Sequence, residues 1–420
     1  MEQQTPAKRD EGAPSPEELL LLSTAKLQFD HNELNSIKSL SREVTDWSLV
    51  TETAQRKFSA TYLHRALLQG ASEFVPPEVM SGLAKTSEFT KLRTLRIAAE
   101  LISFHKSCIE PVDAKHAYLK GIALPLQFNG SYVERYCRDI DILVAEDQFE
   151  KVIHEAMRSG YKVLLATEPI KYVATRDDLM FLTKFRTDIG LISPKGTLIE
   201  VHRRLDKSNL VFDVDDALDS VSSVKVSNIT VKTLRPSLHF AYACYHHSRH
   251  YWSHLHWLAD LDLMLRSEKF DLGEINQIAE TLGLTPTISA SISLANVVSN
   301  PSIWSDLETE GSLTNKFLRS CLLNLHGDLN LEHEMIKGSF TRDFISEAQI
   351  SAHRSRGISA SSWKKSLDPS LTQYLKRPLP VAFFWIYRLE RAMILLRDGV
   401  VRNLNFLRSR ESDTRRHADG

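Results

Sequence analysis

Residues 136–145 read Tyr-Cys-Arg-Asp-Ile-Asp-Ile-Leu-Val-Ala and place two carboxylates inside an apolar run typical of a buried strand. Side chains alternate along a strand, so Asp139 and Asp141 share one face and the isoleucines beside them take the other. Carboxylates attached about 7 Å apart repel each other unless a cation lies between them. Two interpretations follow: a site for a hard ion such as Mg²⁺, or a solvated edge strand in which Asp139 pairs with Arg138 or Arg135.

A second apolar stretch, residues 197–205, reads Thr-Leu-Ile-Glu-Val-His-Arg-Arg-Leu and also has a carboxylate in its middle. In a strand, Glu200 and His202 share one face. A carboxylate within such a run needs a partner, and a neighbouring strand with Asp139 and Asp141 would supply a shared metal. Three carboxylates on two strands meet the requirement of two-metal phosphoryl transfer.

Residues 119–124, Leu-Lys-Gly-Ile-Ala-Leu, contain a glycine where a strand could turn into a helix. Backbone N–H groups at a helix start bind phosphate, and a glycine lets the phosphate approach closely. The stretch is therefore a candidate phosphate-binding turn, although most glycines only turn the chain.

The composition limits the classes of function. Of the 420 residues, 42% are hydrophobic and 25% charged, with a net charge of -1; this is ordinary for a globular protein and gives no bulk attraction to nucleic acid. The four cysteines form no CxxC pair, which disfavours a disulfide framework or a cysteine zinc site. The polar first residues lack the apolar core of a signal peptide, and the apolar run 381–387 is too short to span a bilayer. A cytoplasmic protein without a membrane span is predicted.

The spacing of apolar residues along the chain predicts an α/β (α+β) fold with a small mixed sheet between helical regions. Helical spacing of apolar residues predicts helices in 17–111, with a helix start at Pro76-Pro77. Short apolar segments alternating with helical stretches predict the mixed-sheet core in 112–232. Helical texture returns in 233–408, where 300–375 is least informative, while 1–16 and 409–420 are predicted to be disordered or frayed.

In their order along the chain, the motifs resemble a large bacterial family of uncharacterised nucleotidyltransferases, within the superfamily that shares the polymerase-β-type fold. That family's pattern is LKG, then an arginine-led D-[IL]-D-x-LV strand, then [VI]-E-[LV]-H-x-R-L. It appears here at 119–121, 138–144 and 199–205. The likeness extends over roughly residues 40–270 and includes a helix pair with H-x3-H-x-W followed by W-L-x-D-L.

The resemblance implies a nucleotidyltransferase core in 112–232 with Mg²⁺, or Mn²⁺ in its place, as cofactor. Asp139 and Asp141 would be the primary metal ligands and Glu200 the third carboxylate. The activity implied is transfer of a nucleoside monophosphate from an NTP, such as ATP, to an unidentified acceptor, with release of pyrophosphate. The acceptor class, the preferred NTP and the oligomeric state are left open.

Nucleotide binding by Lys120, Gly121 and Arg138 is also implied by the resemblance. The wider superfamily has Gly-Ser in the phosphate-binding turn, whereas Ile122 follows the glycine here. The missing hydroxyl leaves Lys120 to act as a point charge on the triphosphate. Arg138 either steadies a phosphate or pairs with a nearby carboxylate.

Residues 246–256, His-His-Ser-Arg-His-Tyr-Trp-Ser-His-Leu-His, hold five of the sixteen histidines. His246, His250 and His254 are spaced four apart, which predicts one face of a helix and permits a zinc site. The family pattern favours another role, in which His246, His250 and Asp260 face the catalytic sheet and, with His202, position substrate or brace the interdomain cleft.

Two other functions are compatible with parts of the sequence. A DxD glycosyltransferase would use a metal to hold a nucleotide sugar, but the ordered LKG and IEVH motifs argue against it. A non-catalytic nucleotide-binding interaction protein would keep the fold without turnover, and the intact carboxylates argue against that.

Overall fold

The computed structural model describes residues 14–206, 211–299, 313–325, 367–394 and 397. Five helices precede the first strand: α1 Pro16–Thr24, α2 His31–Glu43, α3 Trp47–Arg56, α4 Ala60–Gly70 and α5 Pro77–Phe104. Three short helical turns lie beside them: η1 Ser72–Phe74, η2 His105–Ile109 (a π-helix) and η3 Glu110–Val112. The predicted helix start at Pro76-Pro77 is confirmed, since α5 has Pro77 in its first turn, where a missing N–H costs nothing.

The strands and the helices between them occupy the middle of the chain. The strands are β1 His116–Leu119, β2 Asp139–Val144, β3 Lys162–Thr167, β4 Ile170–Tyr172, β5 Asp188–Ile192, β6 Leu198–His202, β7 Val221–Val226 and β8 Ile229–Leu234. The helices among them are α6 Ala123–Gln127, α7 Phe149–Arg158, α8 Arg176–Phe185 and α9 Val214–Asp219. After them come α10 Pro236–Ser248, α11 Leu255–Arg266, α12 Leu272–Leu282, α13 Thr285–Ser299, α14 Leu313–Leu325, α18 Leu371–Lys376 and η5 Val381–Phe383.

The strands form one mixed sheet of eight, in the order β4-β3-β5-β6-β2-β1-β8-β7. β2 runs parallel to β6 and β1 parallel to β8, while the other neighbours are antiparallel. The α/β fold predicted from the sequence, a mixed sheet with helices before and after it, is confirmed. The edge-strand interpretation of 136–145 is wrong, because β2 is an interior strand between β6 and β1.

The register of β2 and β6 places the acidic residues opposite one another. Asp139 lies across from Leu198, Asp141 from Glu200 and Leu143 from His202. Since parallel neighbours present aligned residues to the same side, the acidic side chains and the imidazole share one face of the sheet. The predicted alternation along both strands is therefore confirmed.

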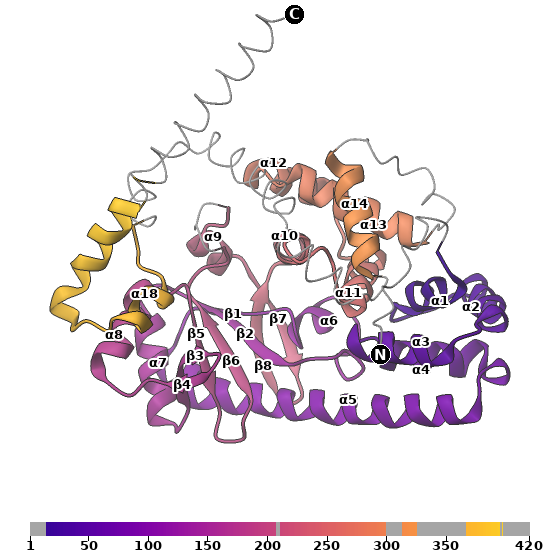
Figure 1. Ribbon diagram of the computed structural model, residues 1–420, viewed down its shortest axis with the longest axis horizontal. Helices are drawn as coiled ribbons and strands as arrows, with labels where there is room; N and C mark the ends of the chain where they lie inside the picture. Colours follow the sequence, from indigo (N-terminus) through magenta and orange to yellow (C-terminus); the bar gives the residue numbers. More distant parts are fainter. Residues whose placement is uncertain (1–13, 207–210, 300–312, 326–366, 395–396, 398–420) are drawn as a thin grey trace, which may run out of the picture.

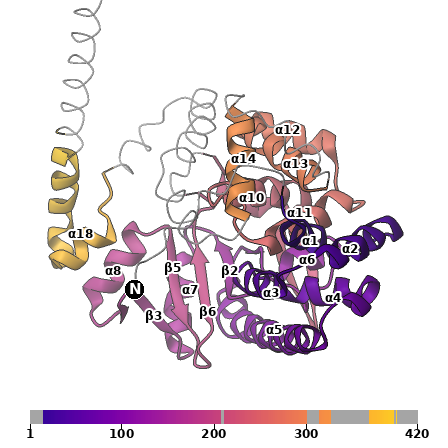
Figure 2. The ribbon, with the colours of Figure 1, turned by 45° about the vertical axis from the view of Figure 1, so that its right-hand side comes forward.

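Helices cover both faces of the sheet, and two hydrophobic clusters hold the layers together. The isoleucines of β2 pack in one cluster with the second half of α5, with α7 and with α8. The face of the sheet that carries Asp139, Asp141 and Glu200 is called the carboxylate face. Leu143 lies on this face and packs in the other cluster with α10, α11 and α13. Figures 1 and 2 show α5 running below the sheet and α10 to α14 gathered above it. The carboxylates of β2 therefore face the layer that contains α10.

The last described segment, residues 371–394, packs against α8 rather than against α12 to α14 (Figure 1). Phe181 of α8 stacks on Tyr374 with ring centroids 4.2 Å apart, and the Tyr374 hydroxyl donates to Asp178 at 2.7 Å. The division of the chain into separate domains at 112 and 232 stays a prediction. Residues 300–375, where the sequence is least informative, and both predicted frayed ends fall mainly outside the described residues. Of the helices described, none is long and apolar enough to cross a membrane.

Candidate active site

Asp141 is the most tightly held acidic group of the carboxylate face. Its side chain is 7% exposed, with Oδ2 at 3.2 Å from Lys120 Nζ and Oδ1 at 3.0 Å from His202 Nε2. Burial alone raises its pKa, but the Lys120 ammonium and the His202 hydrogen bond outweigh burial and hold the pKa well below its usual range. Asp141 is therefore ionised in the protein.

The pKa values of Glu200 and Asp139 are shifted in the opposite direction, upward. Burial raises the pKa of Glu200 to about 7, and the nearby charge of Asp141 adds to the shift. Burial and the Asp141 charge likewise raise the pKa of Asp139, although Lys120 and Arg138 partly offset them. The face thus holds three carboxyl groups that repel one another when all are ionised, which is the electrostatic state that a bound cation relieves.

The atoms that could ligate an ion come together around Asp141. One oxygen each of Asp141 and Glu200 and one ring nitrogen of His202 all lie within 4.8 Å of one another, the only such group among the described residues. Two carboxylate oxygens suit Mg²⁺ or Mn²⁺, and the His202 ring holds one of these carboxylates, Asp141, through its Nε2 contact. The donor set therefore fits a divalent ion.

Asp139 lies on the same face but outside that group. Its nearest cation is Arg138, with Nε at 3.6 Å from Oδ2, and the Arg138 side chain is 68% exposed. The pairing of Asp139 with Arg138 expected as one alternative is therefore present, as a long and solvent-facing contact. The alternative pairing with Arg135 is wrong, since that guanidinium binds Asp260.

The loop between β1 and α6 brings Lys120 to the carboxylates through a strained turn. Lys120 has φ +40° and Gly121 φ +44°, and a non-glycine residue with positive φ is uncommon. A Cβ on Gly121 would also meet Cys137 Sγ at 3.4 Å. The backbone N–H of Lys120 donates to His239 Nε2 at 3.1 Å. Because burial lowers the pKa of His239 to about 3, that nitrogen stays a neutral acceptor.

Two residues of this arrangement, His239 and Tyr242 of α10, were not predicted from the sequence. His239 Nδ1 donates to Gln127 Oε1 at 2.7 Å, which fixes the ring against the Lys120 turn. The Tyr242 ring lies 6.0 Å from Lys120 Nζ. The available signal was spacing, because His239 and His246 lie seven residues, about two helical turns, apart on one face of α10.

His246 joins α10 to the carboxylate face. Lys120 Nζ donates to its Nε2 at 3.2 Å. Burial and the Lys120 charge hold the pKa of His246 well below its usual value, so the ring is a neutral acceptor. The structure thus brings Asp141, Lys120 and His246 together in one chain of contacts.

The expected helical face of His246, His250 and His254 is wrong. α10 ends at Ser248, and Tyr251 and Trp252 have φ +52° and +50°, so the chain turns before α11 begins at Leu255. His250 stays near His246, with ring centroids 5.4 Å apart. His254 instead lies 4.9 Å from the Phe58 ring.

Asp260 is paired with Arg135. The pair is buried, with side chains 0% and 5% exposed, and the guanidinium donates from Nε at 2.8 Å and from Nη2 at 2.7 Å. Arg135 lies in the segment that enters β2, and Asp260 lies on α11. The ion pair therefore ties the helical layer to the strand that bears the catalytic candidates.

A family model described as "Uncharacterised nucleotidyltransferase" matches residues 43–300, which include every residue singled out from the sequence as a site candidate. No curated protein matches the chain significantly.

Proposed function

Because the chain belongs to the uncharacterised nucleotidyltransferase family, we propose that it transfers a nucleoside monophosphate from an NTP to an acceptor, with pyrophosphate as the leaving group. The observation that carries the proposal is the pairing of Asp141 with Glu200 across two parallel strands, with Asp139 on the same face. Three mutually repelling carboxyl groups are costly to keep in a folded protein, and a metal–nucleotide complex gives them a use.

The ion would be Mg²⁺, with Mn²⁺ as a substitute, held by Asp139, Asp141 and Glu200. When bound, it would offset charge on the phosphates and activate the attacking oxygen. The contribution of His202 is orientation: its Nε2 contact fixes one oxygen of Asp141 and leaves the second directed at Lys120.

Lys120 has two roles in this proposal. Without nucleotide, its ammonium neutralises Asp141 and donates to His246. With a cation held by the carboxylates, the Lys120 ammonium would be free to turn toward the triphosphate and serve there as a point charge. The turn at Gly121 and the exposed Arg138 lie at the same edge and would contact phosphate oxygens.

The helices on the carboxylate face, α10 and α11 among them, would position the nucleotide over the sheet. His246 would face the site as a neutral ring with His250 beside it, while Asp260 would act through Arg135 on the entry to β2. We expect the enzyme to work in the cytoplasm, where NTPs are abundant.

Isothermal calorimetry with each of the four ribonucleotides tests the proposal. We expect clear binding of at least one NTP with Mg²⁺ or Mn²⁺ and only weak binding in EDTA, because the carboxylates repel an unneutralised triphosphate. Equal affinity in EDTA would exclude the metal-dependent reaction. Incubation with labelled NTP and a cell extract would then show which size fraction receives the label.

A further inference from the structure

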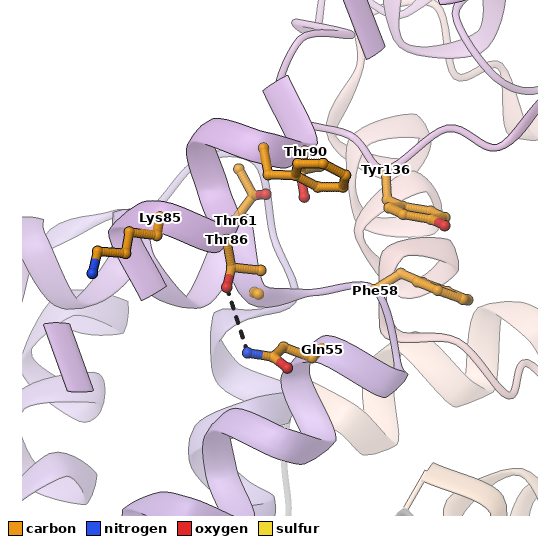
Figure 3. Close-up of a pocket in the computed structure, with 9 residues that line it drawn as sticks. Gln55, Phe58, Thr61, Lys85, Thr86, Thr90 and Tyr136 are labelled. Carbon is orange, nitrogen blue, oxygen red and sulfur yellow. Dashed lines mark hydrogen bonds between the residues drawn. The ribbon is translucent and has the colours of Figure 1, made fainter. Parts of the chain in front are cut away.

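A cavity of about 450 Å³ lies between α3, α4 and α5, beside the segment that leads into β2. Figure 3 shows its lining, with Gln55, Thr86 and Lys85 at one end and the rings of Phe58 and Tyr136 at the other. Small-molecule sites have volumes of about 300–1,000 Å³. The cavity is therefore large enough for a metabolite-sized ligand.

Tyr136, which forms one wall of the cavity, lies on the segment that leads to the carboxylates of β2. Tyr136 precedes Asp139 by three residues, a backbone reach of about 10 Å at most. The segment between them is fixed to α5, because Arg93 Nε donates to the Cys137 carbonyl at 3.1 Å and Thr94 Oγ1 to the Arg135 carbonyl at 2.9 Å. A molecule long enough to pass Tyr136 would bring one end to the metal site.

Ring surfaces dominate one end of the cavity. Phe58 stacks on Tyr136 with centroids 4.2 Å apart and planes 13° apart. Phe58 has φ +59°, a strained conformation for a residue with a bulky side chain, so the surroundings hold this ring in place. Phe89, which also lines the cavity, is 65% exposed. These rings favour a flat apolar group, which would cover Phe89 on binding.

The charge of the cavity is positive. None of its described lining residues is acidic, and within the described part of the chain no carboxylate lies in ion-pair distance of Lys85. Arg93 lies over the Tyr136 ring at 5.3 Å, and Arg138 is exposed two residues further on. A negatively charged group on the ligand would find a partner at Lys85.

We propose that this cavity is the acceptor site and that the acceptor is an elongated small molecule with a flat, ring-like apolar group and an acidic group. The inference rests on the proposed nucleotidyl transfer. The nucleophilic oxygen at the far end of the acceptor would form a bond to the α-phosphorus as the bond to the pyrophosphate oxygen breaks. The acceptor proton passes to solvent and the bond's electron pair leaves with pyrophosphate.

Two probes that share one ring system and differ in charge test the chemistry. Saturation-transfer NMR should detect 4-hydroxyphenylacetate binding to the full-length protein more tightly than tyramine. Phe89→Ala should weaken the binding of 4-hydroxyphenylacetate about tenfold, and Lys85→Glu should reverse the preference between the probes. Leu92→Ala is the matched control, an exposed apolar residue of the same helix outside the cavity, and should change nothing.

A second measurement tests the position of the cavity relative to the metal site. Mn²⁺ with NTP should broaden the resonances of bound 4-hydroxyphenylacetate, and Asp141→Asn should abolish that broadening. Binding of the probe without broadening would contradict the acceptor role, because the cavity would then be remote from the nucleotide.

The failures of the two proposals are distinguishable. A protein that binds Mn²⁺ with NTP but neither probe, or that binds the probes equally in Phe89→Ala and Leu92→Ala, contradicts the cavity assignment alone. A protein that binds the probes but shows no metal-dependent NTP binding contradicts the proposed function, and the acceptor role fails with it.

Discussion

Asp139 and Asp141 are two residues apart on one strand, yet their surroundings give them opposite electrostatic states. Asp141 has two close cationic partners, Lys120 and His202, and its pKa is lowered. Asp139 has one long contact to the exposed Arg138, and its pKa is raised. The two aspartates therefore contribute differently to the stability of the metal-free protein.

Asn substitutions separate these two contributions. Asp141→Asn should lower the free energy of unfolding of the metal-free protein by about 3 kcal/mol, because it leaves the Lys120 ammonium buried without its counter-charge. Asp139→Asn should change it by less than about 0.5 kcal/mol, or raise it slightly, because a repelled charge is removed. Urea unfolding of the three proteins measures both values. Equal destabilisation by the two substitutions would contradict the charge assignment.

Lys120→Met tests the same ion pair by removing the Lys120 ammonium instead of the Asp141 carboxylate. The free energy of unfolding should fall by about 3 kcal/mol, because Asp141 then keeps only His202 as a partner. Lys115→Met is the control, since Lys115 pairs with Asp219 in solvent and such pairs contribute at most about 1 kcal/mol. A smaller loss for Lys120→Met than for the control would show that Lys120 does not stabilise Asp141.

The raised pKa of Glu200 predicts a pH dependence. The metal-free folded protein keeps a proton on Glu200 up to a pKa of about 7, whereas the unfolded chain releases it near the ordinary glutamate pKa of 4.5. The stability from this group is therefore complete below pH 4.5 and is lost as the pH rises through 7. A bound metal ion must displace that proton, so the rise in melting temperature caused by Mn²⁺ should be larger at pH 8 than at pH 6. In Glu200→Gln the difference between the two pH values should shrink; an undiminished difference would assign it to another group.

At the scale of single residues, the sequence predicted the acidic residues and the Arg138 contact of Asp139, but not the partners of Asp141. The period of two in residues 139–144 and 198–202 was enough to place Asp139, Asp141 and Glu200 on matching faces. The contact of Lys120 with Asp141 depends on the register of β1 against β2, where Leu119 lies opposite Asp141. No local pattern encodes that register, so the contact could not be predicted.

At the scale of elements, the entry to β2 is braced from two sides. Arg135 binds Asp260 of α11, and its carbonyl accepts from Thr94 of α5. The helices above and below the sheet are thereby connected through one arginine. The arrangement fixes where β2 begins and thus where Asp139 lies.

Removing one member of the Arg135–Asp260 pair should be costly. Asp260→Asn should lower the free energy of unfolding by about 3–5 kcal/mol, because a buried guanidinium loses its counter-charge. The double variant Arg135→Met/Asp260→Leu should recover much of that loss. Asp262→Asn is a control on the same helix, whose partner Arg266 is 41% exposed, and should cost about 1 kcal/mol or less. Chemical denaturation measures all three, and a double variant no more stable than Asp260→Asn would show that the pair is not an isolated electrostatic brace.

Prediction of the elements succeeded where periodicity was strong. α3 and α5 form within 17–111, where helical spacing was predicted, and β2 and β6 form in the apolar stretches 136–145 and 197–205. β4, β5, β7 and β8 were not singled out because they alternate with polar residues, include Gly190 in β5, or lie exposed, as all of β4 does. Their pairing in the sheet, rather than their composition, makes them strands.

In the whole molecule, the sheet separates two layers of helices. One face packs on α5, α7 and α8 (Figure 1). The other face carries the carboxylates and packs on the layer that contains α10. α5 contributes to both hydrophobic clusters, and residues 371–394 return to α8 over a long separation in sequence. Such long-range returns are invisible to a local reading, which grouped these residues with the other C-terminal helices.

The central claim is that the carboxylate face binds a metal–nucleotide complex. Calorimetry of the thermal unfolding of wild type and of Asp139→Asn, each with and without the complex, tests this claim most directly. Asp139→Asn is chosen because the metal-free protein should tolerate it, so a loss of binding cannot be attributed to unfolding. We predict that wild type binds NTP with Mg²⁺ and gains about 2.7 kcal/mol of stability at a hundredfold excess over Kd. Asp139→Asn, equally folded, should lose most of that gain. Retention of the full gain by a folded Asp139→Asn protein would contradict the account.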